Sequence, residues 1–240
     1  MKKIAVVTGA AGGMGRAIVD RLRADNFHVI GLDIDAIGLA DMLSDGFEGI
    51  SIDLTDPKEI KKAFKQIEAN HKGVDALVNN AGTCFMSEFP NIPVGEFERQ
   101  MALNFSGAFH CCQAAIKLMA GRDGVRKIVN ISSNGAYNFD AFDPPHYRAS
   151  KAALDTLTKD LARRYATDKI AVNSIAPAMT ETPLFGVVSK EVLEKAIAQM
   201  PHGRAMQPSE IAAWVGFLIS PAGDVSSGNV IILNQGRDVR

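Results

Sequence analysis

Several features are scarce in this chain of 240 residues, and each scarcity excludes a class of protein. There are three cysteines, Cys84, Cys111 and Cys112, with no Cys-x-x-Cys pair, and adjacent cysteines cannot easily pair with each other. We therefore expect no disulfide framework, and reduced thiols in a cytoplasmic protein. Each thiol is predicted to be a small core hydrophobe, with a reactive thiol at Cys84 as the alternative.

Excess charge and long apolar runs are also absent. The 26 basic and 27 acidic residues leave a net charge of −1, whereas nucleic-acid and anionic-membrane partners require a basic excess. Only four apolar residues, Ile4–Val7, precede Thr8-Gly9, fewer than a signal peptide needs, and no run reaches the length of a membrane span. We expect a cytoplasmic protein with a small-molecule substrate, no nucleic-acid or membrane partner, and no metal site.

What is present is an alternation of short apolar strands with longer helical patterns. Apolar residues predominate in the strand patterns, with runs of Val, Ile and Leu, which indicates a parallel sheet covered by helices on both faces. No repeat or linker interrupts the alternation, so we predict one doubly wound α/β domain over residues 1–240 with a seven-stranded parallel sheet. The expected strands are Ile4–Val7, His28–Leu32, Gly49–Ile52, Ala76–Val78, Lys127–Ile131, Ala171–Ile175 and Val230–Leu233. The expected helices are Gly13–Ala24, Ala36–Leu43, Pro57–Asn70, Val94–Met119, Tyr147–Tyr165, Lys190–Gln199 and Ser209–Ile219.

One segment, Thr180–Gly203, departs from this alternation between the sixth strand and the last helix. It combines Pro183, Gly186 and Pro201 with a short helical pattern. An insertion at the carboxyl end of a parallel sheet lies where ligands bind, so we expect a substrate lid at about residues 180–203. A static surface excursion is the alternative.

A glycine-rich turn joins the first strand to the first helix in the run Thr8-Gly9-Ala10-Ala11-Gly12-Gly13-Met14-Gly15. Such a turn lets the backbone approach a pyrophosphate at the helix N-terminus, where amide donors and the helix dipole favour anions. The run differs from the ordinary Gly-x-Gly-x-x-Gly pattern, but its place after the first strand indicates a nucleotide site.

The second strand ends at Asp33, an acidic residue that can accept hydrogen bonds from the ribose hydroxyls of an adenosine. The same charge repels a 2′-phosphate, and the turn from Thr8 to Gly15 holds no Arg or Lys that would bind one. Both points favour NAD over NADP. The alternative for Asp33 is a cap of the following turn, a role that Asp35 can fill instead.

Tyr147 and Lys151 stand four residues apart at the start of an apolar-periodic segment, so a helix would place both side chains on one face. A neighbouring cation stabilises the phenolate and lowers the pKa of the tyrosine, which makes the phenol a usable general acid or base. The pair occurs by chance in many helices, so its meaning depends on the residues around it.

Five motifs stand in the order seen in the short-chain dehydrogenase/reductase family, which this chain resembles over nearly its whole length. They are Thr8-Gly-x-x-x-Gly13-x-Gly15, Asn79-Asn80-Ala81-Gly82, Asn104, Ser133 and Tyr147-x-x-x-Lys151. The resemblance implies a Rossmann-type fold, hydride transfer with a nicotinamide dinucleotide, and a homotetramer or homodimer.

The resemblance also implies roles for four catalytic residues. Tyr147 would exchange a proton with the substrate oxygen, and Lys151 would lower the pKa of that phenol and bind the nicotinamide ribose. Ser133 would hold the substrate oxygen and its developing charge. Asn104 would support a water that relays protons to Lys151; the alternative is that its side chain satisfies buried backbone groups in a long helix.

The cofactor contacts are likewise implied by the resemblance. Asp53 would lie near the adenine amino group, with a cap of the helix near Pro57 as the alternative, and Ile175 would help to frame the nicotinamide carboxamide. The implied cofactor-binding residues are Gly9, Gly13, Met14, Gly15, Asp33, Asp53, Leu54, Asn80, Ala81, Gly82, Tyr147, Lys151, Pro177 and Thr182.

Three departures from the family pattern affect the site. Ser133 lies 14 residues before Tyr147, one more than is usual, and we choose it over the runner-up Ser132 because it stands last in the strand-end pattern. Pro177-Ala178 replaces the usual Pro-Gly. Asn234-Gln235-Gly236-Arg237 replaces a Gly-Gly pair, in a tail that in the family often packs at a subunit interface.

The segment between Ser133 and Tyr147 must border the substrate pocket if both residues are catalytic. Asp140 and Asp143 in it discourage an anionic substrate, and His146 is expected in an exposed loop, with contact to the substrate as the alternative. The predicted apolar and aromatic pocket residues are Tyr137, Phe139 and Phe142 of this segment and Leu184, Phe185, Val187 and Val188 of the lid.

The main hypothesis is an NAD-dependent alcohol dehydrogenase or carbonyl reductase that interconverts a secondary alcohol and a ketone, with a small polyol, hydroxyketone or cyclic alcohol as substrate. The alternative is an NADPH-dependent 3-oxoacyl thioester (acyl carrier protein) reductase, which Asp33 and the near-neutral charge disfavour. A nucleotide-sensing regulator without turnover is a third possibility, disfavoured by the presence of both Tyr147 and Lys151.

Overall fold

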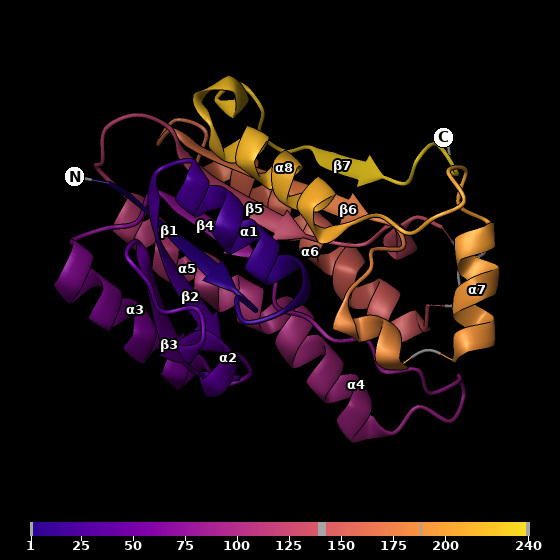
Figure 1. Cartoon of the computed structure of the whole chain (residues 1–240). Helices are drawn as coiled ribbons and strands as arrows, with labels where there is room; N and C mark the ends of the chain where they lie inside the picture. The colour runs from indigo at the N-terminus through magenta and orange to yellow at the C-terminus, as the bar shows by residue number, and fades with distance from the viewer. Residues whose placement is uncertain (1, 139–142, 188, 239–240) are drawn as a thin grey trace.

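The computed structural model describes residues 2–138, 143–187 and 189–238 (Figure 1). Seven strands pair in parallel in the order β3-β2-β1-β4-β5-β6-β7, which confirms the predicted sheet. Every strand lies within two residues of its predicted bounds at either end. The strands are β1 Lys3–Thr8, β2 Phe27–Asp33, β3 Phe47–Ser51, β4 Ala76–Asn79, β5 Arg126–Ile131, β6 Ile170–Pro177 and β7 Val230–Leu233.

The helices follow the predicted pattern with one difference. The helix expected over Val94–Met119 contains a π-helical segment, η1 Ala102–Gly107, in its middle. A π-helical segment of this length spans little more than one turn, which is too short for the period of its apolar residues to distinguish it from an α-helix. The α-helices are α1 Gly13–Ala24, α2 Ala36–Ala40, α3 Pro57–His71, α4 Val94–Met101, α5 Ala108–Met119, α6 Pro145–Arg164, α7 Lys190–Ala198 and α8 Pro208–Ile219. The short 3₁₀ helices are η2 Asn134–Ala136, η3 Pro183–Val187 and η4 Pro221–Gly223.

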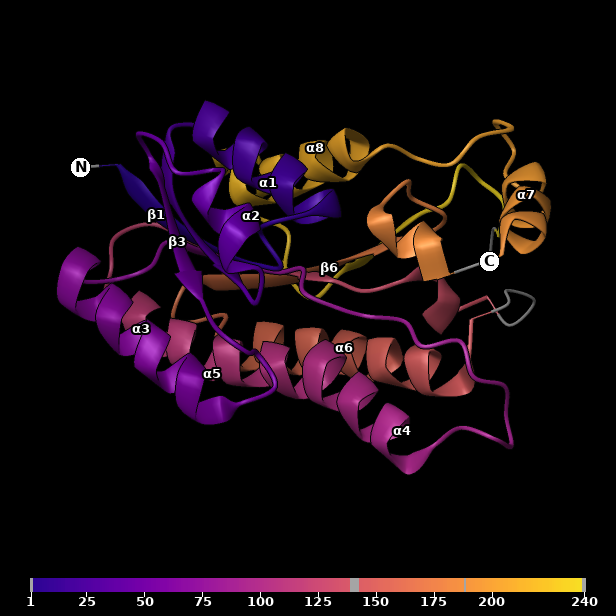
Figure 2. The ribbon, with the colours of Figure 1, turned by 60° about the horizontal axis from the view of Figure 1, so that its bottom comes forward.

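Helices cover both faces of the sheet, with α1 and α8 on one side and α3, α5 and α6 on the other (Figure 2). Each face has its own apolar core: side chains of α1 and α8 pack in one cluster, and side chains of α3 and α5 pack in the second. All residues of β4, β5 and β6 are buried. Two covered faces leave no solvent-facing position in these strands, so apolar residues predominate in them, and polar residues such as Asn130 and Asn173 are buried as well.

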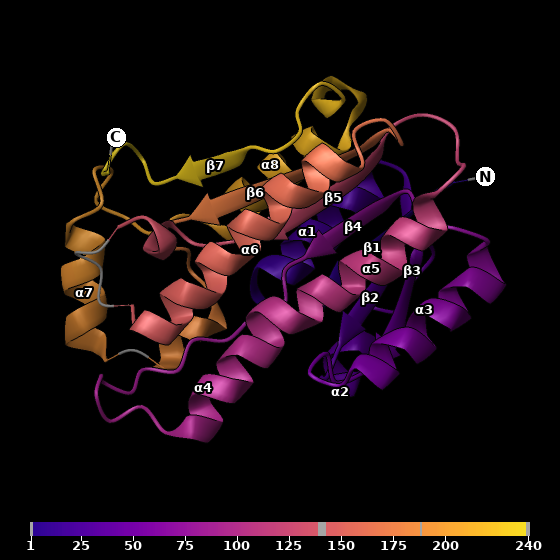
Figure 3. The same cartoon turned by 180° about the vertical axis from the view of Figure 1, so that it is seen from behind.

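The chain switches direction across the sheet between β1 and β4, which are neighbours although β2 and β3 come between them in sequence. At the carboxyl ends of these two strands, the Thr8 hydroxyl oxygen accepts hydrogen bonds of 3.0 Å from the amides of Asn80 and Ala81. A crevice at such a switch point is where open α/β sheets bind ligands. The arrowheads of β6 and β7 point toward α7, so α7 also lies at this edge (Figure 3).

The three cysteines are free and buried. Cys111 and Cys112 lie in the apolar core on the side of α3, as predicted, whereas Cys84 belongs to neither apolar cluster. Burial raises the pKa of Cys84 and of Cys112 to about 12, so both remain neutral thiols near pH 7. A reactive thiolate at Cys84 is therefore not favoured. No helix in the described part of the chain combines the length and apolar character needed to cross a membrane.

Candidate active site

The glycine-rich turn presents uncapped backbone donors at the start of α1. Gly12 is the N-cap and offers no side-chain hydrogen bond, and the first turn holds no acidic residue. Gly9 and Gly13 have φ values of +64° and +52°, which favour glycine, and a Cβ at Gly15 would overlap the Gly9 carbonyl oxygen. The turn therefore fits a pyrophosphate, whose oxygens the free amides and the helix dipole would bind.

A cavity of about 510 Å³ lies over this turn, at the switch point of the sheet. Asp33 borders it, with one carboxylate oxygen accepting from the Ala11 amide at 2.9 Å and the other from the Asp35 amide at 3.0 Å. Asp35 itself caps α2 by accepting from the Gly38 amide. The predicted cofactor residues that line the cavity are Gly9, Gly13, Met14, Asp33, Asp53, Leu54, Asn80, Ala81, Gly82 and Thr182.

Asp53 is not a helix cap, so that alternative is wrong. The N-cap of α3 is Asp56, whose side chain accepts from the Lys58 amide at 2.8 Å. Asp53 accepts instead from the amide and hydroxyl of Thr55, and these hydrogen bonds lower the pKa of its carboxyl group. Its place in the wall of the cavity leaves the adenine contact as a proposal.

A second cavity of about 340 Å³ adjoins the first, and both are bordered by Met14 and Thr182. Ser133 and Tyr147 form part of its wall, and Phe185 from the Thr180–Gly203 segment lines it. Most of the lining is apolar, with Met86 and Met179 among its members. A nucleotide in the first cavity would thus reach the second with one end.

Tyr147 and Lys151 lie on the first turns of α6, and the Lys151 nitrogen is 5.9 Å from the centre of the Tyr147 ring. The ammonium group donates to the Ile131 carbonyl at 2.8 Å. Burial lowers the pKa of Lys151 to about 8, against the opposing effect of the Asp155 carboxylate. The helix therefore brings the pair together as predicted, but with the lysine turned toward the end of β5.

The pKa of Tyr147 is raised, contrary to the prediction that Lys151 lowers it. Burial is the main cause, and the nearby Asp143 carboxylate adds to it. A hydrogen bond with Ser133 acts in the opposite direction. The four-residue spacing reveals the neighbouring Lys151, but it reveals neither the burial of Tyr147 nor its proximity to Asp143. The direction of the pKa shift was therefore not predictable from the sequence.

Ser132 and Ser133 both border the second cavity, but their hydrogen bonds differ. The Ser133 oxygen accepts from the Gly135 amide at 3.0 Å, which leaves its hydroxyl hydrogen free to donate to Tyr147 or to a substrate. The Ser132 hydroxyl instead donates to Asp155 at 2.9 Å. Asp155 is buried and also accepts from the hydroxyls of Tyr137 and Ser174, so Ser132 belongs to a structural network.

Asn104 lies in η1 and pairs with the backbone of Thr83. Its side chain accepts from the Thr83 amide and donates to the Thr83 carbonyl, both at 2.9 Å, and it also donates to the Ser150 hydroxyl at 3.1 Å. These contacts match the alternative role of satisfying buried backbone groups. A Cβ at Gly82 would lie 3.3 Å from both the Asn104 oxygen and the Lys151 nitrogen, so all three meet behind the cavity wall. The water relay stays a proposal.

Several predicted positions differ from the structure. Ile175 is fully buried in the core on the α1 side and borders neither cavity, so its predicted contact with the nicotinamide is wrong. His146 is buried rather than exposed, with its Nε2 3.2 Å from the Glu96 carboxylate of α4. Phe139, Asp140, Phe142 and Val188, and the side chains of Leu184 and Val187, lie outside the described residues.

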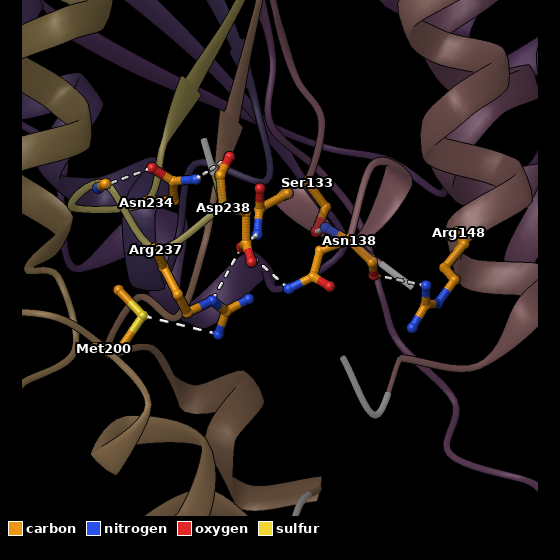
Figure 4. A network of polar contacts seen from close by, with 10 residues as sticks. Ser133, Asn138, Arg148, Met200, Asn234, Arg237 and Asp238 are labelled. Atoms are coloured by element: carbon orange, nitrogen blue, oxygen red, sulfur yellow. Dashed lines mark hydrogen bonds and ion pairs between the residues drawn. The ribbon is translucent and has the colours of Figure 1, made fainter. Parts of the chain in front are cut away.

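The C-terminal tail contributes residues that the sequence did not identify. Asp238 accepts from Asn134 at 2.8 Å, from Asn138 at 3.0 Å and from Arg237 at 2.9 Å (Figure 4). Asn134 and Arg237 both line the second cavity, as does Asp143, whose pKa burial raises. The tail thus braces the loop that follows Ser133 from more than 100 residues away in sequence, a separation across which no local pattern gives a signal.

The first cavity, over the glycine-rich turn, lies at the switch point of the sheet, and the second cavity beside it is bordered by Ser133 and Tyr147. Together they define a Rossmann-type oxidoreductase site. A family model described as enoyl-(acyl carrier protein) reductase matches residues 9–238. The chain belongs to the short-chain dehydrogenase/reductase family. It is therefore an oxidoreductase that acts on CH–OH groups with a nicotinamide dinucleotide.

Relatives with different substrates match almost the full chain. The 3-oxoacyl-[acyl-carrier-protein] reductase FabG of Vibrio cholerae is 33% identical over 98% of this chain and 96% of its own length. The 3alpha-hydroxysteroid dehydrogenase of Mediterraneibacter gnavus is 32% identical over 95% of this chain and 94% of its own. Among solved structures, a short-chain dehydrogenase of the glucose/ribitol type from Brucella melitensis superposes with a TM-score of 0.92, with 30% identity and complete coverage of both chains.

Proposed function

We propose that this protein interconverts a secondary alcohol and a ketone by hydride transfer with NAD, with Tyr147 exchanging the proton. The observation that carries the proposal is the shared wall of the second cavity. Ser133 and Tyr147 border it together, and it adjoins the nucleotide cavity at Met14 and Thr182. Tyr147 would thus supply the proton to a carbonyl oxygen bound in the second cavity, while the residues of the first cavity would hold the dinucleotide.

The bound dinucleotide would supply or accept the hydride, and the chain's own residues would handle the proton. Because the pKa of Tyr147 is raised, its phenol keeps the proton that reduction of a ketone requires. Ser133 would hold the same carbonyl oxygen by donating its hydroxyl hydrogen. Lys151, with a pKa of about 8, exchanges protons near neutral pH and would return one to the phenol, with Asn104 behind it.

The proposed lid consists of η3 and α7. From it, Phe185, Val192 and Ala196 line the second cavity, and Lys195 stands at its border. Apolar side chains of this kind exclude water from a reacting carbonyl, which strengthens hydrogen bonds to its oxygen. The lid would thus select for a substrate with an apolar portion.

A second candidate substrate is a 3-oxoacyl thioester, whose reduction is the same ketone chemistry. The matched family model and the Vibrio cholerae relative favour it over the polyol or hydroxyketone expected from the sequence. The predominantly apolar lining of the cavity suits an acyl chain. Asp33 at the nucleotide cavity favours NADH over NADPH as the reductant in either case.

The two candidates are separated by a panel of ketones assayed through the absorbance of NADH and NADPH. Acetoacetyl-CoA represents the thioesters, and small hydroxyketones and a cyclic ketone represent the alternative. We expect NADH oxidation with at least one of these ketones, and the ratio of kcat/KM values assigns the substrate class. If no ketone or secondary alcohol supports turnover with either dinucleotide, the proposed function is wrong.

The choice of NAD rests on Asp33, and Asp33→Ala tests it. Each charge-assisted hydrogen bond to a ribose hydroxyl contributes about 1.5–3 kcal/mol. We therefore expect the substitution to lower the ratio of NAD to NADP affinity by roughly tenfold or more. Titration of dinucleotide binding by fluorescence measures this ratio.

Two further variants make the test specific. Asp33→Asn removes the charge but keeps an acceptor for the Ala11 amide, which stabilises the glycine-rich turn. This variant therefore measures the repulsion of the 2′-phosphate without the effect of a disturbed turn. Asp56→Ala removes a carboxylate that caps α3 and borders neither cavity, so it should leave the ratio unchanged. An unaltered ratio in Asp33→Ala contradicts the assignment of NAD.

A further inference from the structure

Three potential metal ligands converge at the end of the sheet opposite the proposed active site. They are His28 on β2, Glu48 on β3 and His71, the last residue of α3. One ligand atom from each lies within 4.8 Å of the other two. None of the three borders either cavity of the proposed active site.

The sheet register accounts for this convergence. Ile30 pairs with Glu48 across β2 and β3, and His28 shares the face of Ile30 because side chains alternate along a strand. Ile30 packs in the same apolar core as Ile67 of α3, so this is the face that α3 covers. The last turn of α3 then brings His71 over the two strand residues. Packing of the core therefore fixes the relative positions of all three backbones.

Both imidazoles approach the same carboxylate. His28 Nε2 lies 2.5 Å and His71 Nε2 lies 3.2 Å from Glu48 Oε1, and the ring centres are 5.1 Å apart. The side chains are 23%, 16% and 39% exposed for His28, His71 and Glu48 respectively. The cluster is thus held by the fold while remaining open to solvent on the side of Glu48.

We propose that His28, Glu48 and His71 bind one Zn²⁺ ion, with a water molecule as the fourth ligand. Two imidazole nitrogens and one carboxylate oxygen are a ligand set that zinc accepts, in tetrahedral geometry with an open position. Mg²⁺ and Ca²⁺ require more oxygen ligands than this cluster supplies. The last turn of a helix favours a cation through its free carbonyl groups, which adds to the attraction of Glu48.

The two distances to Glu48 can be compared with this geometry, and one of them needs a small adjustment. Ligand atoms at zinc distances of about 2.0–2.1 Å in a tetrahedron stand roughly 3.4 Å apart. The spacing of 3.2 Å between His71 and Glu48 already matches, whereas His28 and Glu48 must separate by roughly 1 Å. Glu48 is the most exposed of the three, so a rotation of its side chain achieves this without moving the backbone.

The expected effect of the ion is on stability. The strand β3 is the edge of the sheet, paired on one side by β2 only, and an ion at this cluster would tie β3, β2 and α3 together. Asp33 lies five residues beyond His28 along β2, about 17 Å away, so the ion would act on the nucleotide-binding half without touching cofactor or substrate.

Zinc binding to the full-length protein, after removal of metal with a chelator, tests the site. We expect isothermal titration with ZnCl₂ to give one ion per chain, with a dissociation constant in the micromolar range or lower. At a hundredfold excess over that constant, the Tm should rise by roughly 5 °C or more. Co²⁺ should produce the visible absorption of a tetrahedral site.

Single-residue variants decide whether these three side chains are the ligands. His71→Ala, at the end of α3, and Glu48→Gln, which keeps the size and hydrogen-bonding capacity of the side chain, should each weaken zinc binding at least tenfold. His110→Ala removes a histidine of α5 that pairs with Gln113 and should bind zinc as the unmodified protein does. The proposal is overturned if the unmodified protein takes up no zinc, or if Glu48→Gln and His71→Ala bind it with unchanged affinity.

Discussion

Tyr147→Phe should lower kcat by roughly 10²–10⁴-fold while leaving the affinity for the dinucleotide within about threefold. The phenol borders the second cavity, and its raised pKa keeps the proton in place for a substrate oxygen. Phenylalanine preserves the ring and its packing but removes the only proton that this side chain offers. Steady-state kinetics on the substrate found in the ketone panel, together with a fluorescence titration of NADH, measure the two quantities.

Tyr165→Phe is the matched control for this substitution. Tyr165 follows the last residue of α6, 18 residues beyond Tyr147, or about 27 Å along the helix axis. Its variant should keep the rate of the unmodified protein. Full activity in Tyr147→Phe would exclude the phenol as the proton donor, and loss of NADH binding would show that the substitution acts on the cofactor site instead.

The fold was predictable because burial on both faces of the sheet leaves a direct record in the sequence. In β1 and β4 the buried residues form the apolar runs Ile4–Val7 and Ala76–Val78, so these runs mark the strands, and the alternation of strands with helices indicates a parallel sheet. The η1 segment escaped prediction since its six residues are too few for their period to be distinguished from that of an α-helix. It matters for the site, because η1 holds Asn104 against Thr83.

The site was predictable only where its residues follow one another along an element. The spacing of Tyr147 and Lys151 is a local pattern, and α6 brings the two side chains together. The alternation along the strand did not separate the two serines, because both border the second cavity. The raised pKa of Tyr147 depends on burial, and the contacts of Asp238 join residues about 100 positions apart. Such features arise from tertiary packing, about which local periodicity in the sequence carries no information.

Lys151→Met should abolish most activity and, at the same time, change the pH dependence of stability. Lys151 is buried, with its pKa lowered from 10.5 to about 8. Between these two pH values the unfolded chain binds more protons at this position than the folded chain does, so the stability contributed by this group rises with pH. Below about pH 8 the folded protein must bury a charged ammonium, and that cost amounts to about 3 kcal/mol.

Methionine removes the charge and keeps the length of the side chain, so the free-energy difference between variant and unmodified protein should shift by about 3 kcal/mol in total as the pH rises from about 8 to 10.5. Relative to the unmodified protein, the variant is most stable below pH 8 and loses that advantage above it. Urea unfolding at several pH values measures the difference. Groups remote from Lys151 titrate in both proteins and cancel, whereas the pKa of Cys84, which the Lys151 charge lowers, should rise in the variant.

Lys159→Met, on an exposed position of the same helix, controls for loss of a lysine charge and should leave both rate and pH dependence unchanged. We expect Lys151→Met to lower kcat/KM at least 100-fold, because the proton path to Tyr147 and the proposed ribose contact are both removed. A variant that loses activity but keeps the unmodified pH profile of stability would show that Lys151 is not the group that titrates near pH 8. If the variant loses activity and its stability also changes with pH as described, then the buried charge of Lys151 serves the reaction and lowers the stability of the fold. A trade-off of this kind is common for functional groups.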